Sequence, residues 1–223
     1  MSPKSASKPR PARLIIIDDH PAVREALALR IARHSDMKLV GEADGYNTAL
    51  RLISTTHPDV AIVDIGLKEG NGLDLIKRLR DRGETLRVLV WSMYNESLYA
   101  ERALRAGAQG YITKQQATED IIGAVREVLA GRVYLSPDMT QQLLGRSVGT
   151  RSGPALPEEC LSDRELEVYR LMGQGLSARS IAERMRLSPK TVETYRERIK
   201  EKLGLATTPE LLRHAIRWVE GVP

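Results

Sequence analysis

Short, unbroken apolar runs alternate with stretches of helical period along the first 131 residues. Runs such as residues 14–17 and 60–63 contain no polar residue, which is typical of strands buried on both faces of a parallel sheet. The segments between the runs repeat apolar residues every three or four positions, as amphipathic helices do. The pattern predicts strands at residues 14–17, 38–43, 60–63, 87–91 and 111–113, and helices at residues 22–33, 47–55, 73–82, 96–106 and 118–130.

This strict alternation predicts an α/β domain over residues 12–131. Parallel strands joined through helices make right-handed crossovers and place helices on both faces of the sheet. We therefore expect a five-stranded, parallel, doubly wound fold of the flavodoxin-like kind. Residues 1–11 are basic and rich in Ser and Pro, and we expect a disordered tail there.

The pattern changes after residue 131. Residues 132–158 are rich in Gly, Ser, Thr and Pro, which predicts a linker, with a possible short helix after Ser136-Pro137. From Leu161 onward the period is helical and no strand is indicated. Residues 159–223 are therefore expected to form a small all-α domain of four helices.

Composition narrows the class of protein only a little. A chain of 223 residues is long enough for two small domains, and its net charge of +5 does not repel polyanions. Cys160 is the only cysteine, so an intrachain disulfide is impossible and a reducing, cytoplasmic setting is expected. No apolar run approaches the roughly 20 residues that a membrane span requires, so no membrane partner is expected.

Polar residues end four of the five predicted strands. Asp18 and Asp19 follow the first strand and Asp64 follows the third, while Ser92 and Lys114 follow the last two. Because the carboxyl ends of parallel strands share one edge of the sheet, these side chains are expected to meet. Taken alone, Asp64 is explained equally well as a helix cap. Three neighbouring carboxylates require a cation, for which Mg²⁺ is suited, and the hydroxyl and ammonium suit a phosphoryl group.

Residues from about 13 to 131 resemble the receiver domain of two-component response regulators. The resemblance is carried by IIIDDH (15–20), VAIVDI (60–65), GLDLI (72–76), VLVWS (88–92), RALRAGAQGYITK (102–114) and IIGAVREVLAG (121–131). It implies that Asp64 is the phosphoacceptor. It also implies that Asp19, Asp64 and the Gly66 carbonyl bind Mg²⁺ directly, with Asp18 acting through water.

The same resemblance implies that Lys114 pairs with the phosphoryl group and that Ser92 hydrogen-bonds to it. Tyr111 stands where the family has a switch aromatic, which turns inward when Ser92 moves toward the phosphoryl group. By its pattern alone, Tyr111 is equally well an edge residue with its hydroxyl in water. Two positions depart from the family, because Lys68 stands where Pro is common and Gln115 follows the lysine where many receivers have a cis proline.

The carboxyl-terminal helices carry clear start signals. Ser162 and Glu165 have the spacing of a capping box, and Ser188-Pro189 is a strong helix start. Two short helices joined by a tight turn, the second polar on its outer side, predict a helix-turn-helix. Arginines and lysines are available for DNA phosphates, but acids are interleaved with them. Charge alone therefore favours a solvated helical bundle.

Residues 161–219 resemble the LuxR/NarL-type DNA-binding domain, on the segments LSDRELEV and GLSARSIAERMRLSPKTVETYRERIKEKLGL. The resemblance implies base-edge contacts by Lys190, Glu193, Thr194 and Glu197, and phosphate contacts by Ser177, Ser188, Thr191 and Lys200. Tyr195 replaces a common His and Ser180 a common Glu. Glutamates at positions that contact base edges accept hydrogen bonds from cytosine amines. The operator is therefore expected to differ from the operators of family members that have lysine at these positions.

These observations predict a cytoplasmic response regulator rather than an enzyme. A sensor histidine kinase would phosphorylate Asp64, and phosphorylation would promote homodimerisation and binding to double-stranded promoter DNA. One rival is a Mg²⁺-dependent phosphatase with Asp64 as nucleophile, but its general acid belongs two residues later, where this chain has Gly66. A regulator controlled by protein binding is the second rival, and the complete set of acids, serine and lysine disfavours it.

Overall fold

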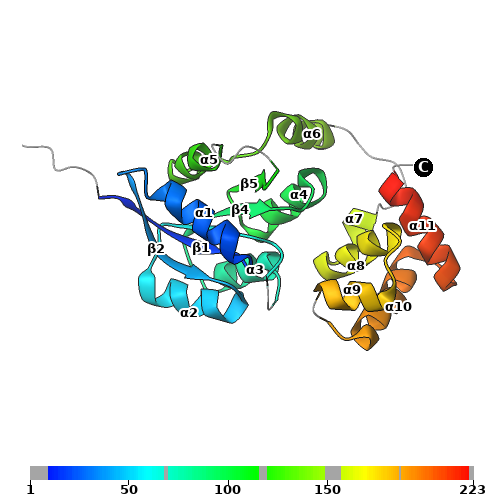
Figure 1. The fold of residues 1–223 in the computed structure, drawn as a ribbon. Coiled ribbons are helices and arrows are strands. Elements are labelled where there is room, and N and C mark those ends of the chain that lie inside the picture. Colours follow the sequence, from blue (N-terminus) through cyan, green and yellow to red (C-terminus); the bar gives the residue numbers. More distant parts are fainter. Residues whose placement is uncertain (1–9, 68–69, 116–119, 149–156, 186, 221–223) are drawn as a thin grey trace, which may run out of the picture. The chain divides into compact units, whose positions relative to one another are not determined.

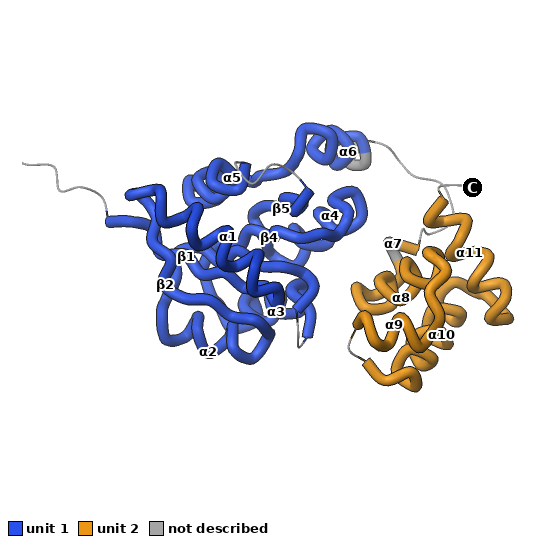
Figure 2. Tube along the Cα trace, in the orientation of Figure 1, with its two compact units in different colours: residues 1–150 blue, residues 151–223 orange. Residues whose placement is uncertain are grey.

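The computed structural model describes residues 10–67, 70–115, 120–148, 157–185 and 187–220. The chain forms two compact units, residues 1–150 and residues 151–223 (Figure 2). Most of the predicted tail, residues 1–9, lies outside the described residues. Within the described ranges, no helix has the length and apolar character needed to cross a membrane.

The first unit is built on a five-stranded parallel sheet with strand order β2-β1-β3-β4-β5, which confirms the predicted fold class. The strands are β1 (Ala12–Ile17), β2 (Met37–Ala43), β3 (Val60–Val63), β4 (Arg87–Ser92) and β5 (Gly110–Thr113). Every residue of β3 is buried, because β3 lies in the middle of the sheet and both its faces are covered. This burial explains why its sequence is an unbroken apolar run.

Helices cover both faces of the sheet (Figure 1). They are α1 (Pro21–Ile31), α2 (Tyr46–Thr56), α3 (Gly72–Asp81), α4 (Glu96–Ala106) and α5 (Asp120–Leu129). Successive side chains of a strand point to opposite faces. Ile16, Ile62 and Trp91 belong to the core on the face that α1 and α5 cover. Helices α2, α3 and α4 lie together on the other face, with α3 in contact with both of its neighbours.

After α5 the chain returns to the edge of the sheet. Tyr134 pairs with β5: its N–H donates to the Gln109 carbonyl at 3.0 Å, and its carbonyl accepts from the Tyr111 N–H at 2.9 Å. Helix α6 (Pro137–Val148) follows and packs against α4. The sequence pattern indicated only a possible short helix in this region. The pairing with β5 was not predicted, because it uses backbone groups that a side-chain pattern does not reveal.

The second unit is helical throughout its described residues. It contains α7 (Pro157–Cys160), α8 (Asp163–Gly173), α9 (Ala178–Met185), α10 (Pro189–Leu203) and α11 (Thr208–Glu220). The short α7 was not predicted, whereas the four longer helices correspond to the four helices expected from the sequence. Helix α8 crosses α11 closely at Gly173, where a Cβ atom would lie 2.4 Å from the Ala215 carbonyl oxygen. Only glycine allows this approach of two helix backbones.

Candidate functional site

Four strand ends bring polar side chains to the carboxyl edge of the sheet. Asp18 follows β1, Asp64 follows β3, Ser92 ends β4 and Lys114 follows β5. Asp64 is 4% exposed and is held from two sides. The Ser92 Oγ donates to Asp64 Oδ1 at 2.5 Å, and the Lys114 Nζ donates to Asp64 Oδ2 at 2.6 Å. The structure thus brings together the residues that the strand ends predicted.

The Lys114 ammonium also joins two of the acids. Its Nζ lies 2.5 Å from Asp18 Oδ2 as well as 2.6 Å from Asp64 Oδ2, and all three side chains are almost fully buried. Asp19 is half-buried beside them, with its Oδ1 2.7 Å from the Nδ1 of His20. One buried cation therefore compensates two buried carboxylates, and the third acid, whose side chain is 12% exposed, lies against His20.

An acidic cluster at this edge could hold a metal ion. Ligand atoms of Asp18, Asp19, His20 and Asp64 all lie within 4.8 Å of one another. Carboxylate oxygens are the ligands that Mg²⁺ and Ca²⁺ prefer, so the three aspartates fit a hard divalent cation. The His20 side chain is 64% exposed and offers nitrogen, which suits such a cation less well. The donor set is consistent with the predicted Mg²⁺.

Burial raises the pKa of the Asp64 carboxyl above its usual value. The opposing charge of Lys114 acts against this shift, the negative charge of Asp18 adds to it, and the hydrogen bonds from Lys114 and Ser92 act against it again without cancelling it. The charged form of Asp64 is therefore less favourable here than in water. Any group that adds positive charge at this edge stabilises the ionised carboxylate.

Tyr111 is fully buried beside this cluster. Its hydroxyl donates to the Tyr94 carbonyl at 2.9 Å, so the alternative of an edge residue with a solvent-facing hydroxyl is wrong. Burial raises the pKa of the Tyr111 hydroxyl well above its usual value, and the negative charge of Asp64 adds to the shift. The ring occupies an inward position in this structure.

The backbone after β3 leaves no space for a side chain at the start of α3. A Cβ atom on Gly72 would lie 2.1 Å from the Asp64 carbonyl oxygen, so only glycine allows α3 to begin against the end of β3. The Asn71 side chain caps the helix by accepting from the Leu73 N–H at 2.7 Å. Helix α3 is thus anchored directly to the residue at the centre of the site.

Of the two positions that depart from the receiver pattern, the structure describes only the one after Lys114. Lys68 and Glu69, next to the site, lie outside the described residues. Gly66 is described, and its N–H donates to Asp64 Oδ1 at 3.3 Å. The bond between Lys114 and Gln115 is trans, since the described backbone contains no cis peptide bond.

Three residues join the site without having been predicted, two through their side chains and one through its backbone carbonyl. His20 contacts the acids, the Tyr94 carbonyl accepts from Tyr111, and the Trp91 ring centroid lies 5.6 Å from the Lys114 Nζ. His20 had a signal, because it directly follows two aspartates in the sequence. Trp91 and Tyr94 had none, because their roles depend on the packing of β4 against its neighbours.

In the second unit, α9 and α10 form the predicted helix-turn-helix. Ser188 caps α10 by accepting from the Thr191 N–H at 3.0 Å. Ser177 plays the same part for α9, accepting from the Ser180 N–H at 3.1 Å. Val192 and Ile199 are fully buried and fix α10 against its neighbours. The polar side of α10 is consequently turned to solvent.

The four predicted base-edge residues share one face of α10. Lys190, Glu193, Thr194 and Glu197 are all exposed, and their spacing of three and four residues places them one above another. Of the predicted phosphate-contacting residues, Ser177 and Ser188 are exposed, whereas Thr191 and Lys200 are half-buried. The structure therefore groups the predicted residues along the outer sides of α9 and α10.

The two glutamates among the predicted base-edge residues each form an ion pair with a basic residue one turn further along α10. Arg196 Nη1 donates to Glu193 Oε1 at 2.7 Å, and Lys200 Nζ lies 2.8 Å from Glu197 Oε2. The Arg196 side chain is only 18% exposed. It lies four residues after Val192 and therefore on the inner stripe of the helix. The negative charges on this face are locally balanced.

Comparison with known families matches both units. The family model described as the response regulator receiver domain matches residues 14–126. The model described as bacterial regulatory proteins, luxR family, matches residues 159–215. Each match covers the residues described above, namely the acidic edge of the sheet in the first case and α8 to α10 in the second.

Full-length relatives are similar over nearly the whole chain. The response regulator GacA of Pseudomonas aeruginosa is 33% identical over 205 residues, which cover 92% of this chain and 95% of that protein. The virulence-factor transcription regulator BvgA of Bordetella pertussis is 36% identical over 205 residues, covering 92% and 97%.

Two solved structures of response regulators are similar to this chain. A LuxR-family two-component response regulator from Aurantimonas sp. SI85-9A1 is 34% identical with a TM-score of 0.58, covering 62% of this chain and 99% of that one. RcsB of Salmonella enterica serovar Typhimurium, solved bound to a promoter in the presence of the phosphomimetic BeF₃⁻, is 25% identical with a TM-score of 0.62, covering 92% and 98%.

Proposed function

We propose that this chain, which belongs to the two-component response regulators with a LuxR-family DNA-binding domain, is switched by phosphorylation of Asp64. By its domain content it is a transcriptional regulator. The single observation that carries the proposal is the pair of contacts on Asp64, with Ser92 at 2.5 Å and Lys114 at 2.6 Å. A hydroxyl and an ammonium on one buried carboxylate are the groups that a transferred phosphoryl needs.

The phosphoryl donor is a phosphohistidine of a sensor histidine kinase. An oxygen of the Asp64 carboxylate bonds to phosphorus while the phosphorus–nitrogen bond of the donor breaks. The electron pair of that bond stays on the imidazole, which takes up a proton from solvent. Lys114 then pairs with a phosphoryl oxygen, and the Ser92 hydroxyl donates to another.

Mg²⁺ is the metal that we propose for the acidic cluster. Asp19, Asp64 and the Gly66 carbonyl would bind it directly and Asp18 through water, and it would neutralise charge on the phosphoryl oxygens. The chain itself contributes the fixed positions of these oxygens. Asp18 is held by the His20 N–H, which donates to its Oδ1 at 2.9 Å.

The signal leaves the site through Ser92 and Tyr111. When Ser92 follows the phosphoryl group, the space beside the buried Tyr111 ring changes. Tyr111 is bonded through its backbone N–H to the Tyr134 carbonyl, and the Ser136 N–H donates to the Glu96 side chain on α4 at 2.9 Å. The segment that leads to α6 is therefore attached to the two elements that respond first, β5 and α4.

The output is binding to promoter DNA as a homodimer. Lys190, Glu193, Thr194 and Glu197 read base edges in the major groove, and Ser177, Ser188, Thr191 and Lys200 contact phosphates. Two copies place two recognition helices on half-sites about 34 Å apart, one helical turn of DNA. Double-stranded DNA as the partner fits a cytoplasmic protein.

Phosphoryl transfer is tested on the full chain with a small phosphoryl donor and Mg²⁺. We expect one acid-stable, base-labile phosphoryl group per chain, absent in Asp64→Asn. Asp74→Asn is the matched control, because it makes the same substitution at a half-exposed acid on α3. Equal labelling of Asp64→Asn and the native chain would contradict the proposal.

A further inference from the structure

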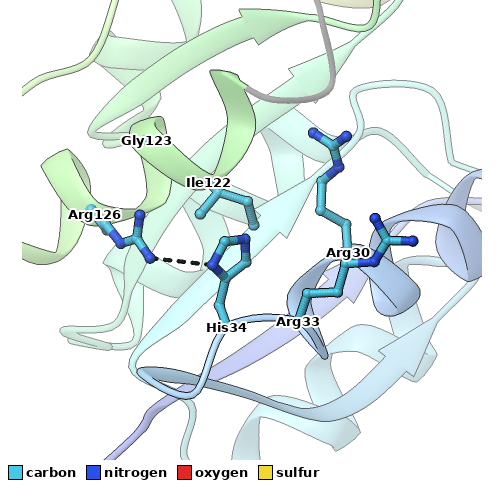
Figure 3. A pocket seen from close by; sticks show the side chains of 6 residues that line it. All are labelled: Arg30, Arg33, His34, Ile122, Gly123 and Arg126. Carbon is cyan, nitrogen blue, oxygen red and sulfur yellow. Dashed lines mark hydrogen bonds between the residues drawn. The ribbon is translucent and has the colours of Figure 1, made fainter.

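A pocket between α1 and α5 is lined by cationic groups and lies away from Asp64. Its volume is about 480 Å³, and it is lined by Arg30, Arg33, His34, Ile122, Gly123 and Arg126. Figure 3 shows Arg126 on one side, the two other arginines on the opposite side, and His34 and Ile122 between them. No carboxylate is among these lining residues.

Helix electrostatics explain only part of this cationic lining. Arginine is favourable in the last turn of a helix, and Arg30 and Arg126 occupy the last turns of α1 and α5. Arg126 also bonds to Asp36, with Nε to Oδ2 at 2.9 Å. Arg33 differs from both, because it follows the end of α1 and its side chain has no bonded partner among the described residues.

Gly123 leaves bare helix backbone on the wall of this pocket. It lies within α5, where glycine costs about 1 kcal/mol relative to alanine. A Cβ atom at Gly123 would meet nothing within 4 Å, so packing among the described residues gives no reason for glycine. A bare helix backbone on a pocket wall allows a ligand to come close to it.

An apolar compartment adjoins the cationic one. A second pocket of about 260 Å³ is lined by Ala26, Leu27, Leu29 and Trp91 together with the same Arg30 and Arg33. Leu29 is 62% exposed and so presents apolar surface to this compartment. The two compartments thus share two arginines and offer apolar contact at one end and positive charge at the other.

We infer that this double pocket binds a small phosphate-bearing molecule with an apolar or aromatic body, such as a nucleotide. The phosphates lie against Arg30 and Arg33, whose planar guanidinium groups match phosphate oxygens in pairs. Arg126, whose Nε and Nη2 are bonded to Asp36, adds positive charge beside them. The His34 ring lies beside them, with its Nδ1 3.4 Å from Arg126 Nη2. The body of the ligand lies against Leu29 and Trp91.

The Trp91 side chain lies between this pocket and the phosphorylation site. The Trp91 ring lines the apolar compartment, its centroid is 5.6 Å from the Lys114 Nζ, and that ammonium is bonded to Asp64. A ligand that moves the ring therefore changes the surroundings of Lys114. The binding itself does not depend on phosphorylation of Asp64, so it can be tested separately.

The test is a titration of the full ¹⁵N-labelled chain with ADP and with pyrophosphate, followed at the two indole N–H signals in NMR spectra. Trp91 lines the pocket, and Trp218 lies in the other unit and serves as the internal control. We expect both probes to move the Trp91 signal only, and ADP to bind tighter than pyrophosphate. No movement of the Trp91 signal at millimolar probe, or equal affinity for both probes, would overturn the inference.

Three variants distinguish binding at this pocket from non-specific electrostatic attraction to the chain. Arg33→Glu should weaken ADP binding about tenfold or more, and Gly123→Leu should abolish it by filling the pocket. Arg51→Glu, an exposed arginine on α2 at the other face of the sheet, is the matched control and should bind as the native chain does. Equal weakening by Arg33→Glu and Arg51→Glu would show non-specific attraction and refute the site.

Discussion

Asp64 carries its charge in surroundings that disfavour it. Its pKa is raised in the folded chain, first by burial, so the folded state binds the proton more tightly than the unfolded chain does. Protonation of Asp64 therefore stabilises the folded chain. This contribution is fully present below the pKa of the unfolded chain, usually 3.8, and is lost as pH rises through the pKa of the folded chain. At neutral pH the ionised carboxylate therefore lowers the stability of the receiver domain.

Replacing Asp64 by Asn should consequently stabilise the chain at neutral pH in the absence of divalent cations. We expect the free energy of unfolding to rise, because the amide keeps the shape of the carboxylate and loses the charge that burial disfavours. The gain should shrink as pH falls through the raised folded pKa and should be absent well below pH 3.8, where the native carboxyl is protonated in both states. Thermal unfolding at several pH values measures it.

Asp74→Asn again supplies the control, since its half-exposed carboxyl should leave the melting temperature unchanged. A lower melting temperature for Asp64→Asn than for the native chain at pH 7 would contradict the assignment of burial as the main cause of the shift.

Among the elements of the second unit, one ion pair connects α8 to α10. Glu165 is the third residue of α8 and closes its capping box with Ser162, and the Lys202 Nζ from α10 donates to its Oε2 at 2.6 Å. Burial alone would raise the pKa of Glu165, but the bonds from Lys202 and Ser162 outweigh burial and lower it. The orientation of α10 thus depends in part on a carboxylate on α8.

Lys202→Met should destabilise the junction of α8 and α10 by about 1 kcal/mol at neutral pH, because it removes the charged partner of Glu165. Glu165 keeps its bond from the Ser162 N–H, and the half-exposed Lys202 is screened by solvent. A carboxyl with a lowered folded pKa contributes stability above its unfolded value, here near 4.5, and loses it as pH falls through the folded value. The difference between variant and native chain should therefore disappear in acid. Hydrogen exchange of the α8 amides measures it.

Lys190→Met, a substitution of the same kind at an exposed position of α10, should leave that exchange unchanged. A destabilisation by Lys202→Met that persists undiminished at pH 3 would mean that Lys202 acts by packing and not through Glu165.

The elements show how far sequence reasoning extends. β1, β3 and β4 were predictable because a strand covered on both faces must be apolar throughout, and their ends then located Asp18, Asp64 and Ser92. Lys114 followed in the same way from β5. Features that depend on packing between distant segments had no such signal, among them the Trp91 ring beside Lys114, the pairing of Tyr134 with β5 and the partial burial of Arg196.

For the whole molecule, the account requires that two separately folded units act as one switch. The receiver unit offers a phosphorylation site whose neighbours, β5 and α4, hold the segment that continues into α6. The DNA-binding unit offers an exposed face on α10 with its glutamates balanced by Arg196 and Lys200. Phosphorylation can regulate transcription only if it changes how tightly two copies of the second unit bind DNA as a pair.

The most direct test of this claim is the affinity of the full chain for a DNA site obtained by in vitro selection, measured with and without BeF₃⁻ and Mg²⁺. We predict that the phosphoryl mimic tightens binding about tenfold or more in the native chain and in Asp74→Asn, with dimers forming on the DNA, and has no effect in Asp64→Asn. An affinity that is the same with and without the mimic in the native chain would contradict the account.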